Sequence, residues 1–215
     1  MKIGIIGATG KAGRDIFAEA VSRGHEVVAL VRDADRAAEV LGADTPVVVR
    51  DAFELTQKDL AQFDVVVNAF GTSPEQAHGH VSLARHLVET IDGAEPRVVF
   101  ILGAGSLTTG ADNHLYVEDI ANIPGAEAWI SIPRYQLQEL QYLRDIQSVN
   151  WVGISPGAIF EPGRATTPKV GKDQLLVDEA GNSHTTTGTM AVAVLDEIEK
   201  PKHRNCRFTV VDGAN

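Results

Sequence analysis

The sequence has a single cysteine, no long apolar run and few aromatic residues. Because Cys206 stands alone among 215 residues, an internal disulfide framework and a CxxC metal site are both excluded, as is usual in a reducing compartment. No apolar stretch approaches the roughly 20 residues of a membrane-spanning helix. The apolar run Ile3–Ile6 is too short for the core of a signal peptide. We therefore expect a cytoplasmic protein.

Basic residues are scarce relative to acidic ones. The chain has 19 Lys and Arg against 29 Asp and Glu, which gives a formal net charge of −10. This excess opposes non-specific binding to nucleic acids and anionic membranes, and we expect neither as a partner. Hydrophobic residues make up 44% of the chain, enough for a sizeable core. We expect a single domain over residues 1–215.

Patterns typical of metal sites and hydrolases are also missing. The chain has seven histidines, but His78 and His80 are two residues apart on a predicted helix and do not share a face. No histidine pair has a carboxylate at metalloprotease spacing, so we expect no metal site. The G-x-S-x-G elbow of hydrolases is absent, which argues against Ser106 with His114 as a hydrolytic pair.

Short apolar segments alternate with helical patterns along the chain. The predicted strands are Lys2–Gly7, Glu26–Val31, Pro46–Arg50, Asp64–Asn68, Arg97–Leu102, Asn150–Ser155, Leu175–Asp178 and Phe208–Val211. The predicted helices are Lys11–Arg23, a helix capped by Asp33 and ending at Leu41 before Gly42, Thr56–Phe63, Pro74–Ile91, Ala126–Gln147 and Thr187–Lys200. We expect Pro133 to kink or divide its helix, and Gly103–Gly125 to be mostly loop. This alternation predicts an α/β fold with a doubly wound parallel sheet and a small C-terminal elaboration.

A glycine-rich turn carries the main chemical signal. Gly7, Gly10 and Gly13 in GATGKAG stand where the first strand meets the first helix. Such glycines allow a tight turn, close approach of the backbone to a pyrophosphate, and packing of the helix on the sheet. The helix N-terminus then receives the phosphate charge. Because strand and helix flank the motif, we favour a dinucleotide site that includes Thr9 and Lys11 over a tight turn without ligand.

The end of the second strand is expected to meet the adenosine ribose. An acidic residue there would bind the 2′-hydroxyl of NAD, whereas Arg32 comes first and can pair with the 2′-phosphate of NADP. Lys11 can add a second positive charge. The alternatives are a surface Arg32 paired with Asp33 or Asp35, and Asp33 as a helix cap. We favour NADPH, with NADH as the alternative.

Two further strand ends should border the same ligand, because ligands of open parallel sheets lie beyond the carboxyl ends of the strands. The third strand is followed by Asp51, which can accept from the adenine amino group, and by Phe53, which can flank the ring. Helix capping by Asp51 and core packing by Phe70 are the alternatives. The candidate cofactor residues at these two ends are Asp51, Ala52, Asn68, Ala69, Phe70 and Gly71.

Seven segments together resemble the bacterial NAD(P)H-flavin reductase-like family of atypical short-chain dehydrogenases. That family is related to biliverdin-IXβ reductase and to NmrA-type sensors. The segments are GATGKAG at 7–13, LVRD at 30–33, NAFG at 68–71, LGAGSL at 102–107, ISPGAIFEPG at 154–163, DQLLVDEAGNS at 173–183 and FTV at 208–210. The resemblance implies an NAD(P)-binding Rossmann fold and reduction of flavins or similar acceptors.

The sequence departs from the larger dehydrogenase superfamily, whose Tyr-x-x-x-Lys pair moves a proton at neutral pH. The three tyrosines and the residues four positions later are Tyr116 and Ile120, Tyr135 and Glu139, and Tyr142 and Ile146. The missing lysine argues against alcohol oxidation by that mechanism. Hydride transfer to a flavin needs no tuned tyrosine, since the chemistry belongs to the cofactors.

The acceptor is expected above the nicotinamide, between loops in 103–118 and 156–173. Ser106 stands where the superfamily places its catalytic serine, and a local turn-forming role is equally compatible. Pro156 resembles the family's nicotinamide-side proline, with backbone N–H groups expected to be free at Gly157 and Ala158. We expect FMN or riboflavin to bind as a substrate rather than as a prosthetic group. The alternative is an NmrA-like sensor of NADP(H) with little catalysis.

Overall fold

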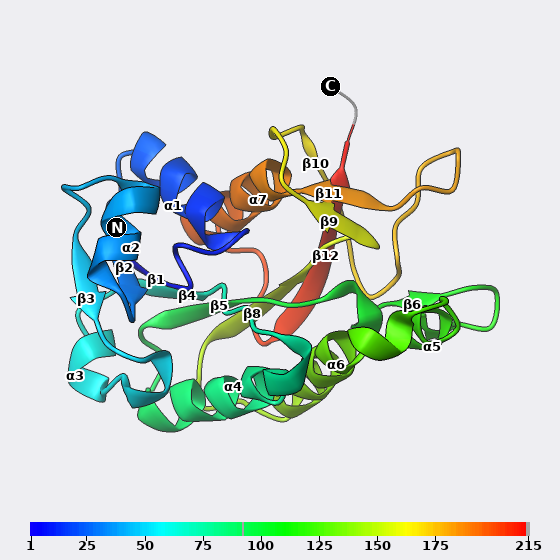
Figure 1. Cartoon of the computed structure of the whole chain (residues 1–215), viewed down its shortest axis with the longest axis horizontal. Coiled ribbons are helices and arrows are strands. Elements are labelled where there is room, and N and C mark those ends of the chain that lie inside the picture. The colour runs from blue at the N-terminus through cyan, green and yellow to red at the C-terminus, as the bar shows by residue number, and fades with distance from the viewer. Residues whose placement is uncertain (92, 214–215) are drawn as a thin grey trace.

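The computed structural model describes residues 1–91 and 93–213 and confirms the doubly wound α/β arrangement. Its central sheet has the strand order β10-β12-β8-β5-β4-β1-β2-β3 (Figure 1). Every neighbouring pair is parallel except β10 and β12, which are antiparallel. Of the predicted domain 1–215, residues 92, 214 and 215 lie outside the described residues.

Seven of the eight strands of this sheet lie close to their predicted positions, and the edge strand β10 was not predicted. The eight strands are β1 (Lys2–Ile6), β2 (Glu26–Val31), β3 (Val47–Val49), β4 (Val65–Asn68), β5 (Arg97–Ile101), β8 (Trp151–Ser155), β10 (Pro168–Gly171) and β12 (Cys206–Asp212). Two small two-stranded sheets pair β6 (Thr108–Thr109) with β7 (His114–Leu115), and β9 (Ile159–Glu161) with β11 (His184–Thr186).

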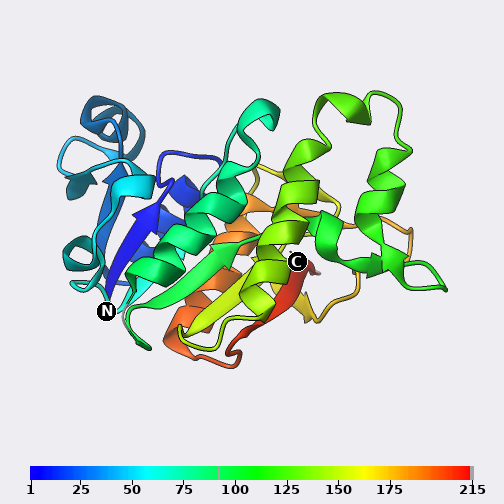
Figure 2. The ribbon, with the colours of Figure 1, turned by 90° about the horizontal axis from the view of Figure 1, so that it is seen from below.

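Helices cover both faces of the sheet. They are α1 (Gly13–Ser22), α2 (Ala34–Leu41), α3 (Gln57–Leu60), α4 (Gly79–Thr90), α5 (Tyr116–Ala121), α6 (Ser131–Arg144) and α7 (Thr187–Glu199). Short 3-10 turns occur at η1 (Ala52–Glu54), η2 (Pro74–Gln76), η3 (Ala104–Ser106) and η4 (Ala126–Ala128). The helices α1 and α7 pack together over one face, and α4 packs against α6 over the other (Figures 1 and 2).

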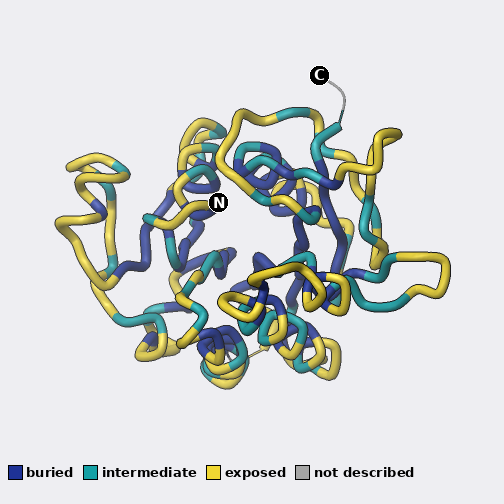
Figure 3. The backbone as a smooth tube through the Cα atoms, turned by 45° about the vertical axis from the view of Figure 1, so that its right-hand side comes forward, coloured by how far each residue is buried: buried dark blue, intermediate teal, exposed yellow. Residues whose placement is uncertain are grey.

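The apolar strands are buried because both of their faces are covered. Ile3 and Ile5 pack under α1 and α7, whereas Ile6 packs in the core beneath α4 and α6. Side chains alternate between the faces of a strand, so a strand covered on both sides reads as a continuous apolar run. Figure 3 shows these strands as the buried centre of the molecule.

The direction of winding reverses at β1. From β1 the chain builds outward through β2 to β3, and then returns to place β4 on the other side of β1. The glycine turn that follows β1 therefore lies at the switch point of the sheet, where ligands of such folds bind.

The second half of the chain differs from the prediction in three segments. The expected strand Leu175–Asp178 does not form, and Pro156–Gly171 contains β9 and β10 instead. The segment Gly103–Gly125 contains α5 besides loops. The local sequence could not show this, because β9 is defined by its pairing with β11 about 25 residues later in the chain.

Two prolines act at helix starts. The predicted helix Ala126–Gln147 is divided into η4 and α6, and Pro133 is the third residue of α6, where N–H groups have no partner within the helix. Pro74 begins η2, which is separate from α4, so the predicted helix Pro74–Ile91 is divided. Within the described residues, no helix is both long and apolar enough to cross a membrane.

Candidate functional site

A cleft of about 950 Å³ lies beyond the carboxyl ends of the central strands. This volume is within the roughly 300–1,000 Å³ of ordinary small-molecule sites. Eleven of the fourteen predicted site residues border it: Gly7, Thr9, Gly10, Lys11, Arg32, Asp51, Ala52, Ala69, Phe70, Gly71 and Pro156. The other three, Gly13, Asn68 and Ser106, are not among its lining residues.

The glycine turn forms a cradle that larger residues would fill. Gly7 has a φ of +72°, and a Cβ atom there would lie 2.5 Å from the Ala69 carbonyl oxygen. A Cβ atom at Gly13 would overlap the carbonyl oxygen of Gly7. Gly13 therefore brings α1 against the turn rather than lining the cleft. No side chain caps the start of α1, where the Arg14 N–H donates to the Gly10 carbonyl oxygen at 3.2 Å, so the positive end of the helix can still face a phosphate.

Three arginines gather at the outer end of the cleft. Arg32 follows β2 and is exposed, and it makes none of the ion pairs recorded for residues 1–91 and 93–213. Arg50 follows β3, which pairs with β2, and its Nε atom lies 3.2 Å from Asp59. Arg36 also borders the cleft. The sequence indicated only Arg32, although Arg36 follows it by four residues.

Asp33 is a helix cap. Its side chain accepts a hydrogen bond of 3.0 Å from the Arg36 backbone N–H at the start of α2. The carboxylate thus caps the helix, which was one of the alternatives considered, and the Arg32 side chain borders the cleft.

Two aromatic rings form a wall beside the arginines. Phe53 and Phe70 meet edge to face, with ring centroids 5.7 Å apart. Asp51 accepts a hydrogen bond from the Phe53 backbone N–H, and the buried Asn68 accepts one from Phe70. Asp51 therefore caps η1 while it borders the cleft, whereas Asn68 shapes the loop from beneath.

Lys11 does not join the arginines, contrary to expectation. Its ammonium group donates a hydrogen bond of 2.7 Å to the Phe160 carbonyl oxygen and lies 4.8 Å from the centroid of the Phe160 ring. Lys11 thus connects the glycine turn to β9 across the cleft. The combination of a hydrogen bond and a cation–π contact explains why the side chain turns this way.

Ser106 is buried and is not among the residues that line the cleft, which favours the local turn-forming role over a catalytic one. The residue is 4% exposed, and its hydroxyl donates to the Gly103 carbonyl oxygen and accepts from the Arg207 guanidinium. Arg207 also pairs with Asp173 at 2.6 Å. A buried guanidinium needs several acceptors, and Ser106 is one of them.

The backbone N–H groups that follow Pro156 were expected to be free, but both are hydrogen-bonded within the protein. The N–H of Gly157 donates to the Thr185 hydroxyl at 2.8 Å, and that of Ala158 donates to Ser183 at 3.0 Å. These donors therefore support the wall of the cleft and cannot bind a ligand.

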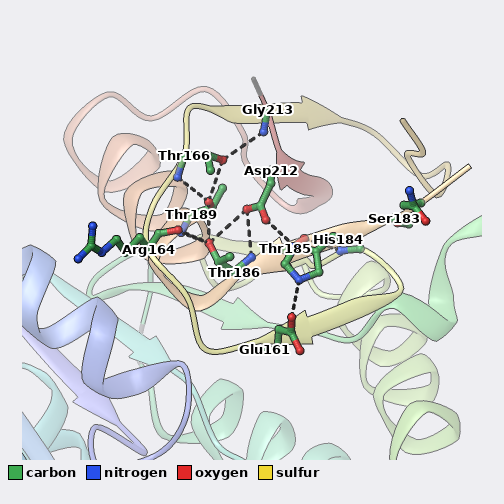
Figure 4. A network of polar contacts seen from close by, with 12 residues as sticks. Glu161, Arg164, Thr166, Ser183, His184, Thr185, Thr186, Thr189, Asp212 and Gly213 are labelled. Carbon is green, nitrogen blue, oxygen red and sulfur yellow. Dashed lines mark hydrogen bonds and ion pairs between the residues drawn. The ribbon is translucent and has the colours of Figure 1, made fainter. Parts of the chain in front are cut away.

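A polar network behind that wall holds it in place (Figure 4). His184 lies between Asp212, at 2.6 Å, and Glu161, at 2.9 Å, and hydrogen bonds to these carboxylates, first to Glu161, raise its pKa. Thr186 caps α7 and donates to Asp212. The network joins β9, β11, β12 and α7, so the position of the Pro156 wall depends on four separate elements.

The inner wall comes from α4, α6 and the residues just before α6, and no motif indicated it. Its members in the cleft are His80, Trp129, Ile132, Pro133 and Gln136. They meet the strand ends because α4 and α6 pack against each other on the same face of the sheet. Burial lowers the pKa of His80 to about 4. No group of three or more His, Cys, Asp or Glu side chains in the described part of the chain is placed to hold a metal ion.

His80 is expected to make the protein less stable in acid. Its folded pKa of about 4 lies below its usual value of 6.5, so the unfolded chain binds more protons between these two values. The free energy of unfolding should therefore fall as the pH drops from 6.5 towards 4, by at most about 3 kcal/mol at roughly 1.4 kcal/mol per pKa unit. Urea unfolding of a His80→Gln variant should show a smaller acid loss. The exposed His78→Gln is the matched control, and equal losses in all three proteins would contradict the prediction.

Comparisons with known proteins agree with this geometry. A model of the family described as NAD(P)H-binding matches residues 7–201. The uncharacterized protein YwnB of Bacillus subtilis (strain 168) is 41% identical over 217 residues, with both chains fully covered. A crystal structure from Lactobacillus casei is 42% identical over the whole of both chains, with a TM-score of 0.93. A candidate NADH-flavin reductase from Streptococcus pneumoniae TIGR4 is 29% identical, covers 99% of this chain and 100% of its own, and has a TM-score of 0.88.

Proposed function

This chain belongs to the NAD(P)H-binding family, and from that premise we propose that it is an NAD(P)H-dependent reductase. The acceptor that we propose is a free flavin or a similar flat molecule, such as a quinone or a conjugated carbonyl compound. The family-level resemblance predicted from the sequence is confirmed, and the streptococcal relative bears the name of a flavin reductase.

The observation that carries the proposal is the extent of the cleft. It runs from the arginines and the glycine turn past Gly103–Gly105 to Pro156 and Ala158. The outer part has the chemistry of a dinucleotide site, with an uncapped helix start for the pyrophosphate. The inner part is bordered by small residues and by Trp129, which suits a flat ring.

When bound, the reduced nicotinamide supplies a hydride, and the residues of this chain hold the two rings in contact. We propose that Gly7, Thr9 and Gly10 hold the pyrophosphate, and that Phe53 and Phe70 flank the adenine. The arginines at the outer end favour NADPH over NADH, because guanidinium groups pair well with phosphate.

A screen of acceptors tests this proposal. The purified protein is mixed with NADPH or NADH and with FMN, riboflavin or menadione, and the loss of reduced nicotinamide is followed by its absorbance. We expect turnover with at least one acceptor and a preference for NADPH. If no acceptor accelerates oxidation, and oxidised and reduced cofactor bind equally well, the protein is instead a sensor of the nucleotide.

Tyr135 is expected to be dispensable for this reaction. The side chain is half-buried, lies edge to face with His78 at 6.4 Å between ring centroids, and is not among the residues that line the cleft. Tyr135→Phe should keep turnover within a few-fold, whereas the loss of a general acid typically costs about 10²–10⁴ in rate. A fall of that larger size in steady-state turnover would show that Tyr135 moves a proton after all.

A further inference from the structure

Two buried polar side chains face each other across the contact between α4 and α6. His80 is 3% exposed and Glu139 is 1% exposed, and His80 Nδ1 lies 3.7 Å from Glu139 Oε2. Among the described residues, neither His80 Nε2 nor Glu139 Oε2 has a hydrogen-bond partner. Leaving a buried polar group unpaired costs roughly 1–3 kcal/mol, so this pair calls for a purpose other than packing.

One of the two side chains, His80, borders the inner part of the cleft. His80 borders the cleft and lies edge to face with Phe70 at 5.3 Å between ring centroids, while Glu139 sits behind it. Gln136 is three residues before Glu139 and shares its helix face, and its side chain lies against Gly103. His80 therefore stands between the wall beside the adenine and the loop after β5, on the side where the acceptor is proposed to bind.

Burial disfavours the charged form of both groups. Burial raises the pKa of Glu139 well above its usual value and lowers that of His80 to about 4. Desolvation is the one cause acting on either pKa within the described chain, so no charged group on the packed segments opposes it. The other charged or titratable side chains on the two helices are Arg85, His86, Glu89, Arg134, Tyr135, Tyr142 and Arg144. The two shifts therefore favour a carboxylic acid at Glu139 beside a neutral imidazole at His80.

We propose that His80 is a catalytic residue that hydrogen-bonds the acceptor and protonates it, with Glu139 as the positioning residue that resupplies the proton. This inference rests on the proposed reductase function. The acceptor takes a hydride and its electron pair from NADPH, which becomes NADP⁺. One N–H bond of His80 breaks and its proton passes to the acceptor oxygen, while the Glu139 carboxyl proton passes to the other ring nitrogen. Glu139 is left as a carboxylate and regains its proton through His80, which borders the cleft, after the product leaves.

His80 Nδ1 and Glu139 Oε2 are 3.7 Å apart, which is longer than a hydrogen bond, so the proposed proton transfer requires the two side chains to move closer in the complex with substrate. The proposed proton relay from Glu139 through His80 also indicates which class of acceptor is reduced. Reduction of a quinone or a conjugated carbonyl compound creates an oxyanion that needs a proton, whereas a reduced flavin is stable as an anion. The pair therefore favours acceptors of the first class.

Two variants test the relay against both kinds of acceptor. His80→Gln and Glu139→Gln keep similar volume and hydrogen-bonding capacity, but neither can pass a proton on. We expect the turnover number with menadione to fall at least about a hundredfold, in keeping with general acid catalysis. The turnover number with FMN at mildly alkaline pH should stay within a few-fold of that of the parent protein. Glu89→Gln, an exposed carboxyl on α4, is the matched control and should change neither rate.

Equal losses with menadione and FMN would assign the pair a structural role and overturn the inference, and so would no loss with either. If the parent protein reduces no acceptor, the proposed function fails separately. Nitrogen NMR of the imidazole then decides, with the His80 signals assigned by comparison with His80→Gln. Adding NADP⁺ and menadione together, which cannot react, should shift those signals if His80 binds the acceptor. Unchanged signals at saturation would overturn the inference.

Discussion

Arg32→Glu is expected to weaken NADPH binding by between several-fold and about a hundredfold, while NADH binding changes little. A lost charge-assisted contact is worth roughly 1–3 kcal/mol, and the new carboxylate would also repel the 2′-phosphate. Arg32 is exposed beside the cleft, and Asp33 is used as a helix cap, so this guanidinium is the one placed to meet the ribose. Dissociation constants for both cofactors, measured by fluorescence titration, check the result.

Arg204→Glu is the matched control, since it makes the same change of charge at an exposed position that does not line the cleft. It should leave both dissociation constants unchanged. A smaller loss in Arg36→Glu would show that the arginines share the phosphate. Equal weakening of NADPH and NADH by Arg32→Glu would mean that Arg32 does not contact the phosphate.

Gly13→Ala is expected to damage both stability and cofactor binding. The added Cβ would overlap the Gly7 carbonyl oxygen and lie 2.9 Å from Ala8 Cα, and these backbone atoms cannot move without displacing α1 from the sheet. Overpacking of this kind costs about 3 kcal/mol or more. Urea unfolding should show that loss, and NADPH titration of the remaining folded protein should show weaker binding, because the start of α1 has moved.

Gly24→Ala separates this steric effect from backbone strain. Gly24 has a φ of +80°, yet nothing lies within 4 Å of a Cβ atom placed there. The cost should therefore be only the roughly 1–2 kcal/mol of a left-handed non-glycine residue, and NADPH binding should be unaffected. If Gly13→Ala lowered the free energy of unfolding no more than Gly24→Ala does, the close packing of α1 on the turn would not explain why a glycine stands at position 13.

The sequence alone determined the sheet and the outer half of the candidate site. The strands Glu26–Val31 and Arg97–Ile101 and the helix Ala34–Leu41 are encoded by local apolar periodicity, by a capping aspartate and by a closing glycine. These signals act over a few residues, so they can be recognised without the fold. The glycine turn is equally local, because its spacing and its flanking elements are contiguous in the chain.

Only the tertiary structure decided what each candidate side chain does. The sequence around Ser106 and Lys11 does not indicate that these side chains bind Arg207 and Phe160, which lie more than a hundred residues away. The relation between His80 and Glu139 is likewise invisible along the chain, where 58 positions separate them. It arises because α4 and α6 pack on the same face of the sheet and bury both groups at their contact. Burial and long-range hydrogen bonding depend on which surfaces meet, and that is a property of the assembled fold rather than of any segment.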